Sequence, residues 1–131
     1  TFCGNPVSCA AALAVMDIMK RDDYAGKARH IGEVVMKRYK ELQEKYPVIG
    51  DVRGLGAMIG IELVKDKKTK EPATELTAKL IQNAIQKGLL LENCGTAGNV
   101  VRFLAPLTMT DEQMEKGLEI FEASLKEAME A

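Results

Sequence analysis

The residue best suited to hold a ligand is Arg102, which stands inside the otherwise apolar run VVRFL at residues 100–104. A guanidinium in such a run either points to the solvent face of its strand or is paired where it is buried. Periodicity alone favours the solvent-facing position. The functional alternative is a clamp on a substrate carboxylate, because the planar fork of arginine can donate two parallel hydrogen bonds to it.

The lysines do not have the surroundings of nucleophiles. Schiff-base chemistry requires a lysine amine that is deprotonated at the working pH, normally through burial. Every lysine of this chain is expected on the polar side of a helix or in the loop at residues 65–70. We therefore assign no catalytic residue to this chain.

Histidine and cysteine, the other reactive residue types, give no metal site. His30 is the single histidine, and we interpret it as a surface residue between charged neighbours. The three cysteines, an odd number without a CxxC pair, argue together with the single histidine against a disulfide framework and a zinc site. Cys9, in an alanine-rich stretch, is predicted to be a small buried residue. Cys94 is interpreted as an unreactive thiol in a turn, and Cys3 stays undecided.

The glycines at Gly54-Leu55-Gly56 could form a phosphate-binding loop, because backbone amides without nearby side chains can cradle an anion. The residues that follow are typical of a strand and not of a helix. We therefore favour a structural turn or bulge at this step.

The periodic segments predict an α/β fold with helix, helix, strand, helix, strand, strand and helix in that order. Helices are expected from residue 5 to about 20, from 22 or 23 to 46, from 73 to 87, and from 110 onward, where Thr110 and Gln113 form a capping box. Strands are expected at 57–64, 89–92 and 100–104, the last two as a hairpin. These elements predict a small, mainly antiparallel sheet of three to four strands with amphipathic helices on one face.

Composition limits the class of protein. With 131 residues, 47% hydrophobic and 28% charged residues and a net charge of −1, the chain is typical of one globular domain. Without a basic block or a long apolar stretch, we expect no nucleic-acid partner and no membrane partner. The cysteine usage favours a reducing compartment, the cytoplasm. Because the chain begins with Thr1, we expect it to be cut from a longer protein.

Three segments together resemble the class III aminotransferases, the ω-amino acid aminotransferase group of fold type I pyridoxal-phosphate enzymes. They are TFCGNPVSCAAA at residues 1–12, IGDVRGLGAMIGIEL at 49–63 and NVVRFLAPLTMTDEQ at 99–113. Cys3 stands where the family has glycine, and Gly60 stands where it has alanine. The sequence of the second segment is similar to that of bacterial 4-aminobutyrate aminotransferases. Acetylornithine, ornithine and 5-aminovalerate aminotransferases share much of the pattern.

The resemblance implies a transamination in which lysine-bound pyridoxal phosphate takes the amino group of 4-aminobutyrate and passes it to 2-oxoglutarate. Thr1 matches the threonine whose hydroxyl contacts the cofactor phosphate of the neighbouring subunit of a homodimer. Arg102 matches the arginine that holds a substrate carboxylate, which favours the clamp over the solvent-facing alternative. The catalytic lysine and the rest of the cofactor site are expected upstream of Thr1.

The resemblance also implies a domain division and a missing partner. Residues 1–21 are expected to be a helical segment linking from the absent large domain, and residues 22–131 the C-terminal small domain. The apolar first helix should then expose surface, and the chain alone should neither bind pyridoxal phosphate tightly nor turn over. The rival of another class is a free-standing α/β module that binds a small acid through Arg102.

Overall fold

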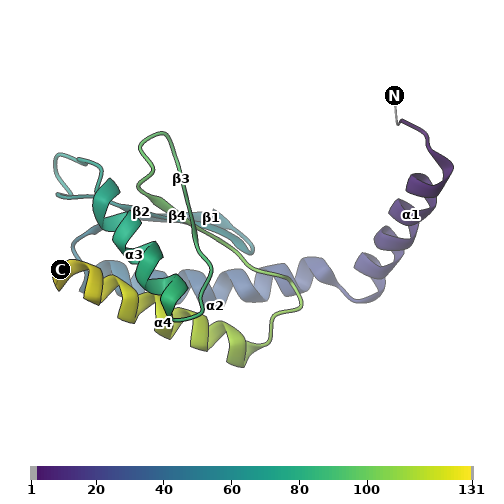
Figure 1. Cartoon of the computed structure of the whole chain (residues 1–131). Coiled ribbons are helices and arrows are strands. Elements are labelled where there is room, and N and C mark those ends of the chain that lie inside the picture. The colour runs from purple at the N-terminus through teal and green to yellow at the C-terminus, as the bar shows by residue number, and fades with distance from the viewer. Residues whose placement is uncertain (1–2, 131) are drawn as a thin grey trace.

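Residues 3–130 of the computed structural model are described, and they form four helices and a four-stranded sheet. The elements follow in the order α1 (Pro6–Arg21), α2 (Tyr24–Lys45), β1 (Ile49–Leu55), β2 (Met58–Leu63), α3 (Thr74–Gln86), β3 (Glu92–Cys94), β4 (Val100–Leu104) and α4 (Asp111–Glu130) (Figure 1).

The strands pair in the order β1-β2-β4-β3, and every pairing is antiparallel. The predicted antiparallel sheet and the predicted hairpin of β3 and β4 are therefore confirmed. The sequence analysis missed β1, because its two glycines lower strand propensity, whereas pairing with β2 stabilises it. The strand predicted at 89–92 was also wrong in extent. Pairing with β4 begins only at Glu92, and residues 89–91 are outside the ladder.

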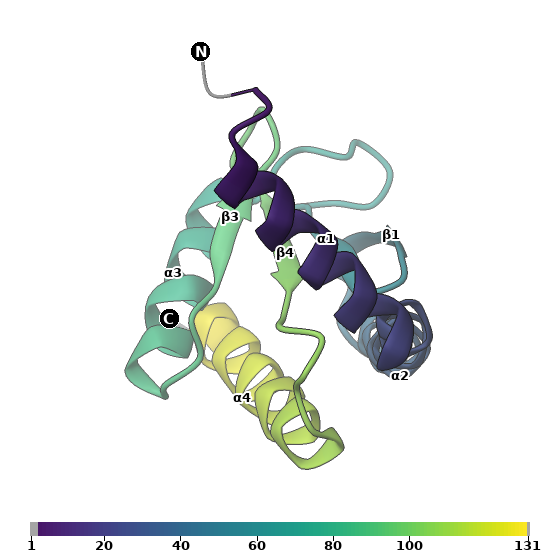
Figure 2. The ribbon, with the colours of Figure 1, turned by 90° about the vertical axis from the view of Figure 1, so that its right-hand side faces the viewer.

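Helices α2, α3 and α4 cover one face of this sheet. Figure 2 shows α3 and α2 on either side, with α4 between them beneath the strands. Alternation along β2 turns Ile59, Ile61 and Leu63 toward these helices. The ring of Tyr39 from α2 meets that of Phe121 from α4 at a centroid distance of 4.9 Å. The largest fully buried side chains are Tyr39, Phe121, Leu42, Ile49, Ile59, Ile61, Leu63, Leu80, Leu118, Leu125, Val35 and Val101.

The helix ends follow the predicted caps. The side chain of Asn5 accepts hydrogen bonds from the amides of Val7 and Ser8 at 2.9 and 3.3 Å. Asp23 caps α2 by accepting from the amide of Gly26. At the start of α4, the Thr110 amide donates to the Gln113 side chain at 3.0 Å and the Gln113 amide donates to the Thr110 hydroxyl at 3.2 Å. The predicted capping box is confirmed.

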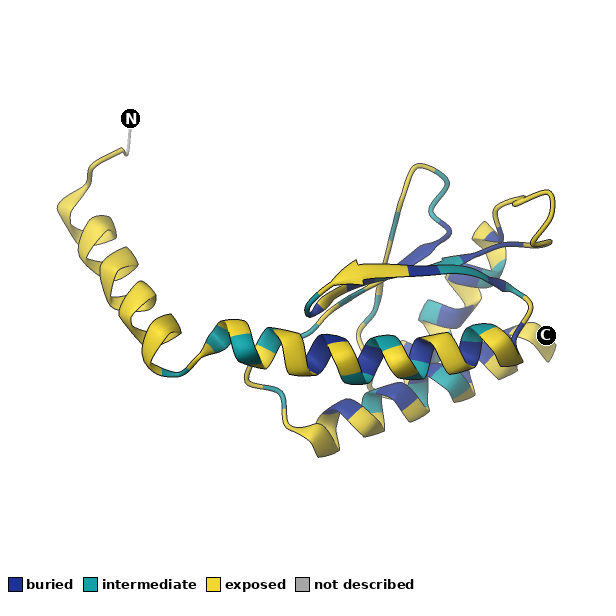
Figure 3. Cartoon of the chain, turned by 180° about the vertical axis from the view of Figure 1, so that it is seen from behind, coloured by how far each residue is buried: buried dark blue, intermediate teal, exposed yellow. Residues whose placement is uncertain are grey.

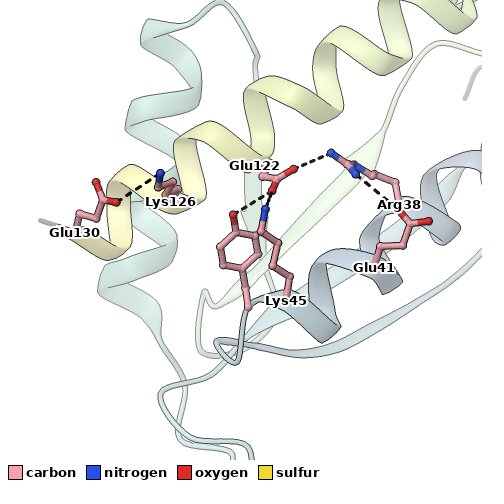
Figure 4. Close-up of polar contacts among 7 residues, drawn as sticks. Arg38, Glu41, Lys45, Glu122, Lys126 and Glu130 are labelled. Atoms are coloured by element: carbon pink, nitrogen blue, oxygen red, sulfur yellow. Dashed lines mark hydrogen bonds and ion pairs between the residues drawn. The ribbon is translucent and has the colours of Figure 1, made fainter.

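A carboxylate on α4 joins the two long helices. Glu122 accepts from Arg38 at 2.7 Å, from Lys45 at 2.6 Å and from the Tyr46 hydroxyl at 3.0 Å (Figure 4). The hydrogen bond from Lys45 is the main cause that lowers the pKa of Glu122 below its usual range. Glu122 therefore stays ionised and fixes α4 against the second half of α2.

Helix α1 stands away from the sheet, and none of its residues is buried (Figure 3). Its large apolar side chains are exposed, namely Val7, Leu13, Val15, Met16, Ile18 and Met19. The prediction that Cys9 is buried was therefore wrong for this chain. An alanine-rich sequence specifies a helix and an apolar surface, but it cannot supply the neighbour that covers that surface.

Candidate functional site

The face of the sheet opposite the helices is open, and the strand register arranges its side chains in rows. One row is apolar and exposed, with Leu55, Met58 and Leu104 on adjacent strands. The row beside it carries Arg53 on β1, Gly60 on β2, Arg102 on β4 and Glu92 on β3. Since adjacent strands lie about 4.8 Å apart, the two arginine backbones are separated by about 10 Å.

Arg102 lies on this open face, which places it where a ligand could reach it. Its side chain is 43% exposed, and its Nη2 donates to Oε2 of Glu92 at 3.1 Å. Glu92 is itself 77% exposed, so this ion pair is weak and can give way to another anion. Both alternatives from the sequence are thus compatible with one geometry: the arginine faces solvent, and its fork is available to a carboxylate.

Arg53, in the same row, is not available in this way. Its Nη1 donates to Asp51 at 2.8 Å and to Glu62 at 2.6 Å, and both contacts raise its pKa, that with Asp51 most. Two carboxylates therefore outweigh its single positive charge. Of the two arginines on this face, Arg102 is the one suited to bind an anion.

A groove opens beside Arg102, where residues 89–91 and 103–106 separate beyond the short β3–β4 pairing. It measures about 450 Å³. Its lining includes Arg102 and Glu92 at the pairing, with Leu91, Phe103 and Met114 among the apolar residues. Neither the groove nor the position of Glu92 beside Arg102 was predicted from the sequence. The hairpin was predicted, but its register, which brings residue 92 opposite residue 102, was not.

The step Gly54-Leu55-Gly56 ends β1 and enters the hairpin turn at Gly56-Ala57, in agreement with the structural interpretation. Gly56 has a φ of +55°, a conformation that favours glycine. A Cβ on Gly32 of α2 would lie 2.4 Å from the Gly56 carbonyl oxygen, so helix and turn touch through their backbones. A Cβ on Gly54 would lie 2.3 Å from the Met58 carbonyl oxygen, so backbone packing accounts for the glycines of this step.

The remaining candidates are dispersed. His30 is a surface residue, as predicted, and its Nε2 lies 2.8 Å from a carboxylate oxygen of Asp111. Within residues 3–130 no cluster of three potential ligands could hold a metal ion. Every lysine in that range is exposed. Thr1, the expected cofactor contact, lies outside the described residues. No helix in the described part of the chain has the length and hydropathy needed to cross a membrane.

The open sheet face of this α/β domain thus presents one arginine whose single partner is exposed, an arrangement chemically suited to an anion. The family model for class III aminotransferases matches residues 1–125. The chain is 47% identical over 120 residues to 5-aminovalerate aminotransferase DavT of Pseudomonas aeruginosa, covering 92% of this chain and 28% of that protein. It is 44% identical over 128 residues to 4-aminobutyrate aminotransferase GabT of Escherichia coli, covering 98% and 30%.

A solved structure shows the same fold. An amine transaminase from an uncultivated Pseudomonas species, in its pyridoxal-phosphate-bound form, superimposes with a TM-score of 0.86 at 34% identity. The match covers 98% of this chain and 29% of that one. The chain belongs to the class III aminotransferases, whose cofactor is pyridoxal phosphate. It spans less than a third of the length of these relatives.

The described residues do not form a cofactor site by themselves. Pyridoxal-phosphate enzymes hold the cofactor through a lysine amine, which requires a desolvated side chain, yet every lysine of residues 3–130 is exposed. Among the two arginines of the open sheet face, Arg102 is the one with a fork available to an anion.

Proposed function

We propose that this chain is the C-terminal part of an aminotransferase that moves the amino group of 4-aminobutyrate to 2-oxoglutarate through pyridoxal phosphate. The products are succinate semialdehyde and glutamate. The observation that carries the proposal is the position of Arg102, on the open sheet face with one exposed and easily displaced carboxylate as its partner. The resemblance to the E. coli 4-aminobutyrate aminotransferase supports the choice of substrate.

In this reaction Arg102 binds and orients the substrate. Its guanidinium donates two charge-assisted hydrogen bonds to the substrate carboxylate, which takes the place of Glu92. The carbon chain then extends away from the strand, so that the amino group at its far end is presented to the part of the enzyme that carries the lysine. Fixing one end of a flexible substrate in this way lowers the entropic part of the barrier.

A second substrate, 5-aminovalerate, is favoured by a specific observation. The relative with 47% identity carries that name, and its substrate differs from 4-aminobutyrate by one methylene group. Arg102 would bind the carboxylate of either substrate alike. The choice between them therefore depends on the distance from Arg102 to the reacting centre, which the upstream part sets.

The missing parts of the site follow from the family. An upstream large domain supplies the lysine, Thr1 contacts the cofactor phosphate of the neighbouring subunit, and the enzyme works as a cytoplasmic homodimer. The 131-residue chain alone neither binds pyridoxal phosphate tightly nor turns over. One hydroxyl contact contributes about 1 kcal/mol, far less than tight binding requires. A visible absorption band from lysine-bound cofactor on adding it to the purified chain would contradict this.

The proposal is tested in the full-length protein that contains this chain. We expect Arg102→Gln to raise the KM for 4-aminobutyrate about 10- to 100-fold, because a charge-assisted hydrogen bond contributes about 1.5 to 3 kcal/mol. Butylamine, which has no carboxylate, should react equally with both forms. Arg53→Gln on the same face is the matched control and should leave the KM unchanged. An unaltered KM in Arg102→Gln would overturn the proposed role.

A further inference from the structure

The groove beside Arg102 has the dimensions of a small-molecule site. Because β3 pairs with β4 over three residue pairs, residues 89–91 and 103–106 are left as two separate walls. Helix α4 closes the groove from below with Gln113, Met114, Gly117 and Leu118. Its volume of about 450 Å³ lies within the range of small-molecule pockets, roughly 300 to 1,000 Å³.

The interior of the groove is apolar, and its charges lie at the edge. Leu89, Leu91 and Phe103 line the walls together with Tyr39. Burial raises the pKa of Tyr39, so its hydroxyl stays neutral. The two charged residues of the lining are Arg102 and Glu92, which pair with each other across the β3–β4 register.

Gly117 keeps the floor of the groove open. It lies in the interior of α4, where glycine is less favourable than alanine. A Cβ at this position would meet only one neighbouring atom within 4 Å, Cδ1 of Leu89 at 3.7 Å. Packing therefore does not require glycine here, in contrast to Gly32. The effect of the missing side chain is free space under the two walls.

We propose that this groove binds a short-chain aliphatic monocarboxylate, with its carboxylate on Arg102 in place of Glu92 and its hydrocarbon tail over Gly117. The charge at the edge and the apolar interior match such a ligand. An ω-amino acid does not match, because its ammonium group would lie among apolar side chains without an anionic partner. The ligand is therefore not the substrate.

Such a ligand competes with the amino-acid substrate for one guanidinium. This competition rests on the proposed function, since it requires Arg102 to be the substrate clamp. Binding in the groove does not rest on it. The monocarboxylate tail enters the groove, whereas the substrate chain extends from Arg102 in another direction. The affinity for the monocarboxylate therefore depends on its tail length, and the affinity for the substrate does not depend on the groove.

The experiment is a calorimetric titration of the full-length protein with propanoate, butanoate, pentanoate and hexanoate. Each added methylene group buried in the groove should lower Kd about fourfold. An affinity that does not change along the series would overturn the proposal, because it would mean that the tail stays in solvent. Undetectable binding of hexanoate would overturn it as well.

Variants of α4 locate the binding site. We expect Gly117→Leu, which fills the floor, to weaken hexanoate at least tenfold, and Gly117→Ala, with one added methyl group, to weaken it about twofold to fourfold. Glu119→Leu adds the same side chain at an exposed position of α4 and should leave Kd unchanged. Thermal melting of each variant shows whether it is folded. If Gly117→Leu does not fold, the Kd of hexanoate for Gly117→Ala tests the binding site.

Arg102→Gln separates the two proposals. Loss of hexanoate binding together with an unaltered KM for 4-aminobutyrate would refute the substrate clamp and support the groove. A raised KM together with tight hexanoate binding that is insensitive to Gly117 would support the clamp and refute the groove.

Discussion

At the scale of single residues, the two arginines of the open face differ in their partners. Arg53 is held by two carboxylates and acts as a structural cation between β1 and β2. Arg102 has one exposed partner, Glu92, and so can exchange it for a ligand. The same residue type thus has a structural role in one strand and a proposed binding role two strands away, because the number of neighbouring carboxylates differs.

A buried amide is important for stability at the same scale. The side chain of Asn99, which is 5% exposed, donates to the Leu63 carbonyl at 2.8 Å, and the Leu63 amide donates to the Asn99 carbonyl at 2.8 Å. We predict that Asn99→Ala lowers the free energy of unfolding by about 1 kcal/mol, because the Leu63 carbonyl loses one of two donors and keeps only the Ala73 amide at 3.1 Å. Urea denaturation of the chain measures this.

The control is Asn93→Ala. The side chain of Asn93 is exposed and makes a long contact of 3.5 Å to the Gly98 carbonyl, so its removal should change stability by less than about 0.5 kcal/mol. Equal effects of the two substitutions would show that burial of Asn99 is not the cause.

At the scale of elements, the contact between α2 and α4 depends on the charge of Glu122. Its pKa is lowered in the folded chain, chiefly by Lys45, so the folded state favours the ionised form. Its contribution to stability is therefore complete above the unfolded pKa of about 4.3 and is lost as the pH falls through the lower folded pKa. The loss lies in the acid range below about pH 5.

We predict that Glu122→Gln lowers the free energy of unfolding at pH 7 by about 1 kcal/mol, after allowance for the partial exposure of its partners. The difference between the two forms should shrink as the pH is lowered from 6 to 3. Denaturation curves at several pH values test this. Glu119→Gln, an exposed carboxylate on the same helix, is the control and should give parallel pH profiles.

Substitution by alanine should have opposite effects on stability at two glycines in helix interiors. A Cβ on Gly32 would lie 2.4 Å from the Gly56 carbonyl oxygen, so Gly32→Ala must separate α2 from the β1–β2 turn. We expect a loss of about 1 to 3 kcal/mol. Gly117→Ala has room and should gain about 0.5 to 1 kcal/mol from helix propensity.

Thermal melting of both variants provides the comparison. A stabilised Gly32→Ala would contradict the close packing of α2 on the turn, and a strongly destabilised Gly117→Ala would contradict the free space at the floor of the groove.

At the scale of the whole molecule, α1 is an apolar helix without a neighbour to cover it. Six large apolar side chains of α1 are exposed, Leu13 to 64% and Met16 to 57%, in a chain that is otherwise folded around one core. In water such a surface favours association. The upstream domain and the second subunit of the proposed homodimer would cover it in the full-length enzyme.

We predict that the 131-residue chain self-associates with increasing concentration and that the chain shortened to residues 22–131 does not. The shortened chain should keep its free energy of unfolding to within about 1 kcal/mol, because α1 buries no residue. Sedimentation velocity measures association, and denaturation measures stability. A 131-residue chain that stays monomeric at high concentration would count against an uncovered interface.

Local sequence patterns were sufficient to predict the helices and the hairpin of β3 and β4, and they single out Arg102 as a candidate. These features depend on local chemistry: the caps at Asn5, Asp23 and Thr110 define helix ends, and a lone cation in an apolar run is recognisable without coordinates. Only the tertiary structure decided the register. Register placed Glu92 opposite Arg102, gave Arg53 two carboxylates and opened the groove over Gly117, because cross-strand partners come from segments whose pairing local propensity does not specify. Burial of Cys9 could not be read from the sequence for the same reason, since burial depends on a neighbour that lies outside the helix itself.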